Sequence, residues 1–371
     1  MNDYYDLIVI GAGISACTFA SNFNKNFPNS SILLVEHGRR IGGRSTSRKS
    51  RNNIIQYDHG LPSITFSNNP PKEIAPMISS LINSKKLIDI SNEIFLIDEK
   101  CEINQAFLNN KTYRCLPFMM NFCEEIVNQS SNPQNINFLF QTLSKSFRRK
   151  NNLWEVEINY KKFVRSKILI LSSSLLAHPR CLEILKVNSL PVRDALLEGK
   201  DYIVDSLIRK ISKQEYIKRR NYILFVSSKS IVKNFKYKYL QVIFSETIKD
   251  EFKFEKIIFQ IQLDGSMIII LHSAYINKLY KKFESVIPSL MLIFAKQKQF
   301  VDLFLEARVI DQMDWRASQP INNFLSQDLQ WSSNNNIGFC GDWFDAGKCS
   351  RVEAAMTSSI RLSNLLNENY L

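Results

Sequence analysis

Gly11-Ala12-Gly13-Ile14-Ser15-Ala16 is the stretch that decides the fold of this chain. It has the spacing G-x-G-x-x-A and lies between an apolar run at residues 5–10 and a helical pattern that ends at Pro28. In such a turn the first glycine permits the tight bend, and the second lets the backbone approach a pyrophosphate. The alanine allows the helix to pack closely on the strand. Strand, turn and helix in this order predict a dinucleotide site, with the phosphates at the N-terminus of the helix.

Residues 31–35 form a second continuous apolar run, and Glu36 follows it directly. A run of this kind predicts a parallel strand that is buried on both faces. An acid at the end of the second strand is placed to accept hydrogen bonds from ribose hydroxyls, although an ordinary surface carboxylate fits the same position. The turn and the acid together predict a dinucleotide site without choosing between NAD and FAD.

The next stretch separates the two cofactors, and it reads Glu36-His37-Gly38-Arg39-Arg40-Ile41-Gly42-Gly43-Arg44-Ser45-Thr46-Ser47. Its glycine pair would let the backbone pass against a cofactor, and Arg44 would offer a fork of hydrogen-bond donors. Arg39 and Arg40 have a rival interpretation as binders of the 2′-phosphate of NADP, but the carboxylate of Glu36 would repel that phosphate. A basic surface loop is the remaining alternative.

A third segment lies near the C-terminus, where Ile337-Gly338-Phe339-Cys340-Gly341-Asp342 indicates a strand, a tight turn and an acid. A helical pattern runs from Val352 to Leu366. The N-terminus of such a helix would stabilise negative charge on a reduced flavin by about 1 kcal/mol. A plain NAD-dependent dehydrogenase leaves this segment unexplained, so a flavoprotein is the better prediction.

These three segments resemble the FAD-containing amine oxidases and their relatives, and within them most closely the renalase-like FAD oxidoreductases. Tyr57-Asp58-His59-Gly60 and Asp314-Trp315-Arg316-Ala317-Ser318-Gln319-Pro320 extend the resemblance over nearly the whole chain. The resemblance implies an α/β fold of the GR2 type. In this fold an FAD-binding Rossmann-like domain carries an inserted α+β substrate domain on a mixed sheet.

The resemblance also implies which residues hold the cofactor, FAD. The acid of the Gly341-Asp342 pair would lie near the ribityl chain, the helix N-terminus at Val352 near the pyrimidine edge, and the strand leading to Leu143 near the adenine. The expected cofactor-binding residues are Gly11, Gly13, Ile14, Ser15, Glu36, Arg40, Gly43, Arg44, Leu143, Gly341, Asp342 and Val352.

Renalases oxidise isomeric, wrongly reduced nicotinamide dinucleotides, and the resemblance implies a similar activity. We expect an FAD-dependent oxidoreductase that takes a hydride from a reduced nicotinamide dinucleotide or a related amine to flavin N5, with re-oxidation by oxygen or another acceptor. Such a transfer needs orientation more than an acid or a base, so no catalytic residue is assigned firmly. His59 and Arg316 are the candidates. Their alternatives are a structural histidine at a turn and an arginine in a packed Trp315-Arg316 stem.

Several positions depart from the family pattern. Gly60-Leu61-Pro62-Ser63 stands where the family has G-A-Q-Y, and Ser172-Ser173-Ser174-Leu175-Leu176-Ala177 replaces a proline-containing segment. Gly38 and Ala354 are two further differences. Cofactor binding tolerates such changes more easily than substrate specificity does. The alternative function is therefore a non-catalytic flavin-binding protein with a degenerate substrate face.

The order of the predicted elements divides the chain into five segments. Residues 1–67, 112–180 and 328–371 are expected in the FAD-binding part, and residues 68–111 and 181–327 in the substrate part. Further expectations are a half-exposed strand at Trp154–Ile158, a helix from Ile276 to about Gln299, loops at residues 48–53 and 128–137, and strands at 239–244, 257–263 and 267–271.

Composition narrows the class of protein further. The 371 residues carry a formal net charge of +13, but the basic side chains are scattered and follow no nucleic-acid-binding motif. The seven cysteines contain no C-x-x-C pair and only four histidines are present, which argues against a disulfide framework and a metal site. No apolar run reaches the length of a membrane span. We expect a cytoplasmic protein that acts on a small molecule such as a pyridine dinucleotide.

Overall fold

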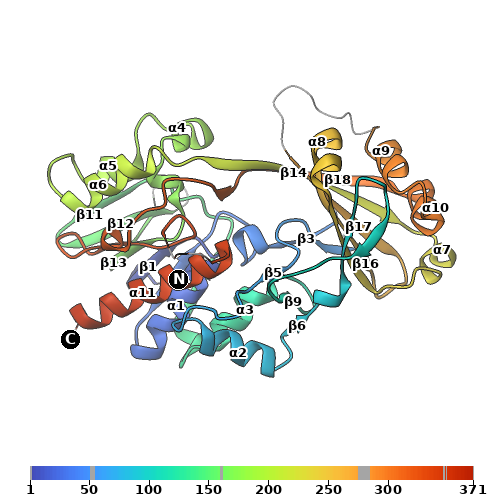
Figure 1. Cartoon of the computed structure of the whole chain (residues 1–371). Helices are drawn as coiled ribbons and strands as arrows, with labels where there is room; N and C mark the ends of the chain where they lie inside the picture. Colours follow the sequence, from blue (N-terminus) through green and yellow to red (C-terminus); the bar gives the residue numbers. More distant parts are fainter. Residues whose placement is uncertain are drawn as a thin grey trace.

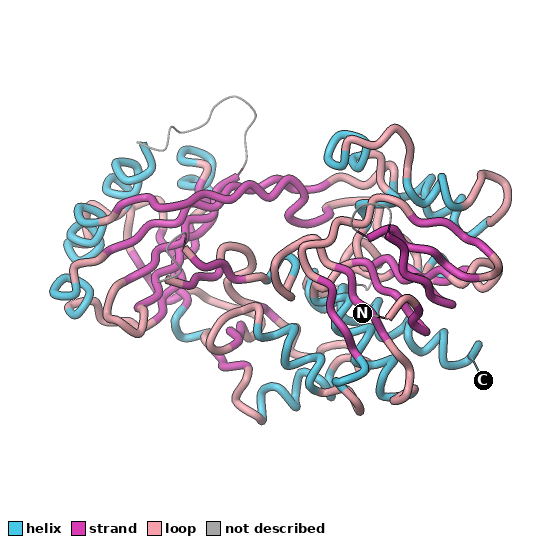
Figure 2. The backbone as a smooth tube through the Cα atoms, turned by 180° about the vertical axis from the view of Figure 1, so that it is seen from behind, coloured by secondary structure: helices cyan, strands magenta, loops and turns pink. Residues whose placement is uncertain are grey.

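The computed structural model describes residues 2–50, 55–158, 162–274, 285–345, 347 and 349–370. Within them the strands form one eight-stranded and one seven-stranded sheet, with two small sheets between them. Figure 1 shows the two large sheets in separate halves of the molecule. The long strands β14 (Tyr216–Val226) and β18 (Arg308–Pro320) run from one half toward the other, which is also visible from behind in Figure 2.

The eight-stranded sheet draws its strands from both ends of the chain, as the sequence predicted. Its parallel strands are β10 (Ile136–Leu139), β2 (Ile32–Val35), β1 (Tyr4–Ile10), β13 (Lys162–Leu171) and β20 (Ile337–Phe339). The antiparallel strands β12 (Leu153–Ile158), β11 (Phe147–Lys150) and β19 (Trp331–Ser332) extend it. Strand order places β1 at the centre, where a continuous apolar run is required because both faces are covered.

Helices cover both faces of this sheet. Leu7 and Val9 of β1 contribute to a core that contains α1 (Ile14–Asn26), α3 (Asn121–Asn128) and α11 (Arg351–Tyr370). Ile8 points the other way, into a core with α4 (Arg180–Leu185), α5 (Pro191–Ala195) and α6 (Tyr202–Ile211), and Ile10 packs against the same core. The alternation of side chains along one strand thus serves two cores.

The seven-stranded sheet is mixed. Its order is β18-β14-β17-β16-β15-β7-β8, in which only the pair of β15 and β7 is parallel. The strands not yet placed are β17 (Met267–Ala274), β16 (Phe254–Ile261), β15 (Tyr239–Phe244), β7 (Ile94–Ile97) and β8 (Ile103–Gln105). Apolar side chains of α7 (Lys229–Lys233), α8 (Glu246–Phe252), α9 (Val286–Ile293) and α10 (Lys298–Glu306) cover one of its faces.

The two small sheets lie between the two large ones. Strands β5 (Ile64–Thr65), β9 (Thr112–Cys115) and β6 (Leu87–Asp89) form one small sheet, and β3 (Ser47–Lys49) pairs with β4 (Gln56–Asp58). Helix α2 (Ala75–Asn83) packs Met77, Ile78 and Leu81 into the core of the first sheet, although the expected segment 68–111 assigns it to the substrate part. Helices α4, α5 and α6, expected in segment 181–327, likewise pack on the first sheet because its second face must be buried.

Two local expectations differ from the structure. Glu155 in β12 was expected on a half-exposed strand, yet it is buried and paired with Arg148 at 2.8 Å and Arg165 at 3.1 Å on the flanking strands. An ion pair on both sides makes burial of a carboxylate tolerable. The single helix expected at 276–299 is instead two helices, α9 and α10, in its described part, while residues 275–284 lie outside the described ranges.

The loop expectations hold in part. Residues 47–49 form β3, and 51–54 lie outside the described ranges; in the second stretch α3 ends at Asn128 and β10 begins at Ile136. Strand 239–244 is confirmed to the residue. No described helix is long and apolar enough to cross a membrane, and within the same ranges no three acidic, cysteine or histidine side chains gather as metal ligands. All seven cysteines are free thiols.

Candidate functional site

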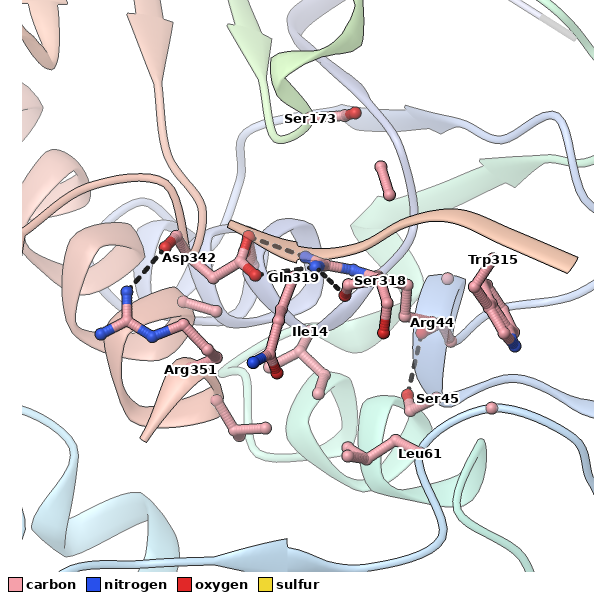
Figure 3. A pocket seen from close by; sticks show the side chains of 18 of the residues that line it. Ile14, Arg44, Ser45, Leu61, Ser173, Trp315, Ser318, Gln319, Asp342 and Arg351 are labelled. Carbon is pink, nitrogen blue, oxygen red and sulfur yellow. Dashed lines mark hydrogen bonds and ion pairs between the residues drawn. The ribbon is translucent and has the colours of Figure 1, made fainter. Parts of the chain in front are cut away.

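A cavity of about 490 Å³ lies between the two large sheets. This volume falls in the range typical of small-molecule and cofactor sites. The first half of the molecule contributes residues 11, 13–15, 36, 42–45, 60–62, 172–174, 180, 342–343, 351–352 and 355. The second half contributes Tyr216 and a group that we call the strand wall, which consists of Arg219, Asn221, Glu255, Lys256 and His272. Strand β18 adds Trp315 and residues 317–319, of which Figure 3 labels Trp315, Ser318 and Gln319.

The glycine turn after β1 forms one end of the cavity. Gly11 has φ +111°, and a Cβ there would collide with the Ser172 hydroxyl, so only glycine fits. Gly13 precedes α1, where no side chain caps the helix and the first turn holds no acid. Ile14 and Ser15 of that first turn line the cavity. The N–H groups of an uncapped helix start, together with the helix dipole, favour an anion at this point.

Glu36 lies against the same turn. One carboxylate oxygen accepts a hydrogen bond from the backbone N–H of Ala12 at 2.9 Å, and the other accepts from Gly38 N–H at 2.6 Å. The side chain also lines the cavity. Because an ionised carboxylate has about four acceptor positions, both oxygens can still accept from hydroxyl groups of a ligand.

Arg44 and Asp342 join the second and third sequence segments. The guanidinium of Arg44 donates to both oxygens of Asp342, each at 2.7 Å, and also to the backbone oxygen of Ser318 at 2.8 Å (Figure 3). Burial lowers the pKa of Arg44, but the ion pair with Asp342 outweighs it and leaves this pKa raised. This bidentate pair closes a chain separation of 298 residues.

The C-terminal helix begins beside this pair. Ser350 and Glu353 form a capping box, in which each side chain accepts a hydrogen bond from the backbone N–H of the other. Arg351 donates to the backbone oxygen of Asp342 at 3.1 Å, and Val352 lines the cavity. The box sets where α11 starts, and this start faces the cavity.

The strand wall forms the opposite side, and the sequence analysis did not single it out. Strand register places Asn221 opposite His272 and His272 opposite Lys256. Arg219 is paired with Glu255 at 2.5 Å. Burial, reinforced by Lys256 and Arg219, lowers the pKa of His272 well below its ordinary value. Polar residues at the ends of otherwise apolar strands were the only signal that pointed to them.

Arg180 is a second residue that the sequence analysis missed. One of its nitrogens donates to the Ser174 hydroxyl at 2.8 Å, and its guanidinium lies 3.9 Å from the ring centre of Tyr216. Its Nε and Nη1 atoms are buried and have no hydrogen-bond partner among the described residues. Burial lowers the pKa of Arg180. These unsatisfied donors border the cavity and suit an anionic oxygen.

Most of the predicted cofactor residues meet at this cavity. Those that line it are Gly11, Gly13, Ile14, Ser15, Glu36, Gly43, Arg44, Asp342 and Val352. Arg40 instead donates to the sulfur of Met120 at 4.0 Å, and Leu143 packs against the core behind the first sheet. Gly341 shapes the turn before Asp342, because its φ is +151° and the Trp343 indole occupies the place of a Cβ.

Neither catalytic candidate lines the cavity. His59 is only 6% exposed, and its ring stacks on Trp315 with 5.5 Å between ring centres. Burial, with a contribution from Arg48, lowers the pKa of His59 to about 4. Arg316 is exposed, whereas its neighbours Trp315 and Ala317 line the cavity. Alternation along β18 therefore turns Arg316 away from the cavity. His59 is buried against Trp315 and does not line the cavity.

Residues 60–63, which differ from the family pattern, border the cavity with apolar side chains. A Cβ at Gly60 would collide with the backbone oxygen of Arg44, and the N–H of Leu61 donates to the same oxygen at 2.9 Å. Leu61 and Pro62 line the cavity, and Ser63 donates to Gln241 at 3.1 Å. The segment is thus tightly held against Arg44 and offers a substrate few polar contacts.

Comparison with known proteins agrees with this architecture. Residues 9–81 match the model of the NAD(P)-binding Rossmann-like domain family. No curated protein matches the chain in sequence. A fatty acid isomerase from P. acnes that produces CLA is 10% identical over 100% of both chains, with a TM-score of 0.61.

Two further structures are similar over most of the chain. A triple mutant of putrescine oxidase, redesigned in its cofactor binding, is 11% identical over 99% of both chains, with a TM-score of 0.61. A flavoprotein/dehydrogenase from Cytophaga hutchinsonii is 11% identical, covers 99% of this chain and 78% of its own, and has a TM-score of 0.53. At such low identity these similarities show the fold, an α/β Rossmann-like domain joined to a substrate part on a mixed sheet.

Proposed function

We propose that this chain is an FAD-dependent oxidoreductase whose flavin binds in the cavity between the two sheets. The observation that carries the proposal is the convergence of three separate segments, represented by Gly13, Arg44 and Asp342, on that one cavity. A site for NAD alone would need the glycine turn and the acid, but it gives no role to Asp342 or to the start of α11.

The described residues fit FAD in chemistry and order. The uncapped start of α1 suits the pyrophosphate, and Glu36 suits the ribose of the adenosine. Arg44 would neutralise phosphate charge, and Asp342 would accept hydrogen bonds from the ribityl hydroxyls. Val352 lies in the first turn of α11, the helix whose dipole would stabilise charge at the pyrimidine edge. The bound flavin would supply the hydride acceptor.

In this proposal the substrate binds against the strand wall. Asn221, Lys256 and His272 face the cavity from the second sheet, opposite the turn that would hold the pyrophosphate. A substrate enclosed between this wall and the flavin would be oriented and shielded from water, which is the main requirement of hydride transfer. We infer a renalase-like reaction on a reduced nicotinamide dinucleotide, in its regular or an isomeric form, or on a related amine, with oxygen or another acceptor as the oxidant.

The test starts with the visible spectrum of the purified protein. We expect flavin absorbance, and bleaching of it when reduced nicotinamide dinucleotide containing its minor isomers is added without oxygen. Arg44→Met should release much of the flavin, whereas Arg48→Met, which breaks the exposed pair of Arg48 with Asp311, should keep it. Protein that never carries or binds FAD, or an Arg44→Met variant that holds it as tightly as the wild type, would contradict the proposal.

A second candidate is a flavin-binding protein without turnover. The apolar lining by Leu61 and Pro62 favours it, because it removes polar contacts from the substrate side. In that case the flavin spectrum would stay unchanged with every reduced dinucleotide and amine offered. Rapid bleaching by any one of them would exclude it.

A further inference from the structure

The strand wall carries an excess of positive charge. Arg219 and Lys256 are basic, and Glu255 is its only acid. The carboxylate of Glu255 is already bound by Arg219, with 2.5 Å between Oε2 and Nε. The ammonium of Lys256 makes no hydrogen bond or ion pair with any residue that the structure describes. One cation on this wall is therefore left for a ligand.

Local strand geometry brings this cation to the cavity. The register of β16 on β17 shifts between Phe254 and Lys256, and both Glu255 and Lys256 line the cavity. In a regular strand two successive side chains would point to opposite faces. The irregularity lets Glu255 reach Arg219 while Lys256 lies beside His272.

Two polar atoms near Lys256 also lack a hydrogen-bond partner among the described residues. Asn221 Oδ1 and His272 Nε2 are buried and have no hydrogen-bond partner among the described residues. Both side chains are at least nine-tenths buried and both residues line the cavity. A buried polar atom without a partner destabilises a protein, so a polar molecule against this wall would relieve that cost.

We propose that the molecule oxidised in this cavity carries a carboxylate or a phosphate, and that Lys256 binds this anionic group. The inference rests on the proposed function and deepens it by naming the substrate class. The pyrophosphate of FAD has its own donors across the cavity, at the start of α1 and at Arg44. A substrate that bears a free ammonium group would instead meet Lys256 and Arg219, with no unpaired carboxylate on the wall to receive it.

The charge of Lys256 gives the test a pH signature. Burial and the nearby Arg219 lower the pKa of Lys256 to about 8, against a smaller opposing effect of Glu255. The neighbouring groups that face it are Arg219 from β14, His272 from β17 and Glu255 from its own strand. His272 has a lowered pKa and is neutral above pH 7. Anion binding should therefore be strong below pH 8 and weaken above it.

The experiment measures binding of simple anions to the flavin-loaded protein. Inorganic phosphate, pyrophosphate and acetate would be titrated at constant ionic strength, with putrescine as the cationic probe. Binding is followed by the change in flavin absorbance and by the fluorescence of Trp315 and Trp343, which line the cavity. Lys256→Gln should weaken anion binding about tenfold or more, as expected for loss of a charged hydrogen bond.

Two variants serve as controls. Lys256→Arg keeps the positive charge and should retain binding, but it should lose the decline above pH 8 because arginine does not deprotonate. Lys218→Gln removes an exposed lysine of β14 that does not line the cavity, and it should bind as the wild type does. Equal stability of the variants against urea would show that each one is folded.

Several outcomes would overturn the inference. These are equal anion affinity in Lys256→Gln and the wild type, tighter binding of putrescine than of any anion, or a Lys256→Gln variant that changes only the flavin potential. The acetate and phosphate titrations distinguish a carboxylate from a phosphate substrate. Protein that lacks flavin would refute the proposed function, while the tryptophan fluorescence would still test Lys256.

Discussion

The ion pair between Arg44 and Asp342 is the contact whose loss should be most informative. Asp342→Asn keeps the shape of the side chain but removes its charge and one of its two acceptor oxygens, so one of the two hydrogen bonds of 2.7 Å is lost and the other loses its charged acceptor. Hydrogen bonds to charged groups contribute about 1.5–3 kcal/mol each. The Arg44 side chain is 44% exposed, so water replaces part of what is lost. We expect the free energy of unfolding to fall by about 2 kcal/mol.

The assay is a double-mutant cycle on the flavin-free protein in urea. Asp342→Asn, Arg44→Met and the double variant are compared with the wild type, and the coupling energy should reach about 1 kcal/mol or more. Arg48→Met is the matched control, because it breaks an arginine–aspartate pair at 3.0 Å outside the cavity. That exposed pair should contribute under about 1 kcal/mol.

The cycle also has a result that would refute the reasoning. If the effects of Asp342→Asn and Arg44→Met add within about 0.5 kcal/mol, the two side chains do not depend on each other. The pair would then contribute nothing to joining the N-terminal and C-terminal segments. A flavin affinity unchanged by either variant would further remove the pair from the cofactor site.

Two other predictions address the turn and the buried histidine. Gly11→Ala should abolish flavin binding and destabilise the protein by about 2 kcal/mol, because φ is +111° and a Cβ would collide with the Ser172 hydroxyl. The control is Gly199→Ala, at φ +78° in open space, which should keep the flavin. Equal retention of flavin by both variants would contradict the argument. For His59 the folded pKa of about 4 lies below the ordinary 6.5, so the unfolded chain takes up the proton first and stability should decline as the pH falls from 6.5 to 4, by up to about 3 kcal/mol. Urea unfolding at pH 7 and pH 4.5 would show this decline, and His59→Gln should reduce it; an identical decline in the variant would assign it to other groups.

The features that could be predicted from the sequence are those that depend on residues close together in the chain. The turn at residues 11–16, the strand before it and the acid at Glu36 follow from local spacing, and the turn and Glu36 meet at the cavity. Val352 at the start of α11 was equally accessible, because its helical pattern is continuous. Helices α4, α5 and α6 fall almost wholly in the expected substrate segment 181–327 but pack on the first sheet, since a local pattern shows that one face of a helix is apolar but not which sheet covers that face.

The site itself was predicted only on one side. The side of the cavity that would hold the cofactor follows from sequence motifs. Arg180 and the strand wall belong to no motif, so the sequence did not predict them. His59 and Arg316 were candidates by their position in recognisable stretches, but burial and strand alternation keep both out of the cavity. Which of two adjacent residues faces a cavity depends on strand register, and register is a property of the partner strands as well.

By itself the sequence determined the strand, glycine turn and helix of a Rossmann-like fold, because the backbone geometry of that turn depends on residues only a few positions apart. Tertiary structure alone decided that Asp342 would meet Arg44 and that Lys256 would face the same cavity as Gly11. These meetings depend on how two sheets pack and on one irregular pair of strands, β16 and β17. Contacts between residues so distant in the chain form only when the whole core is assembled, so no local pattern records them.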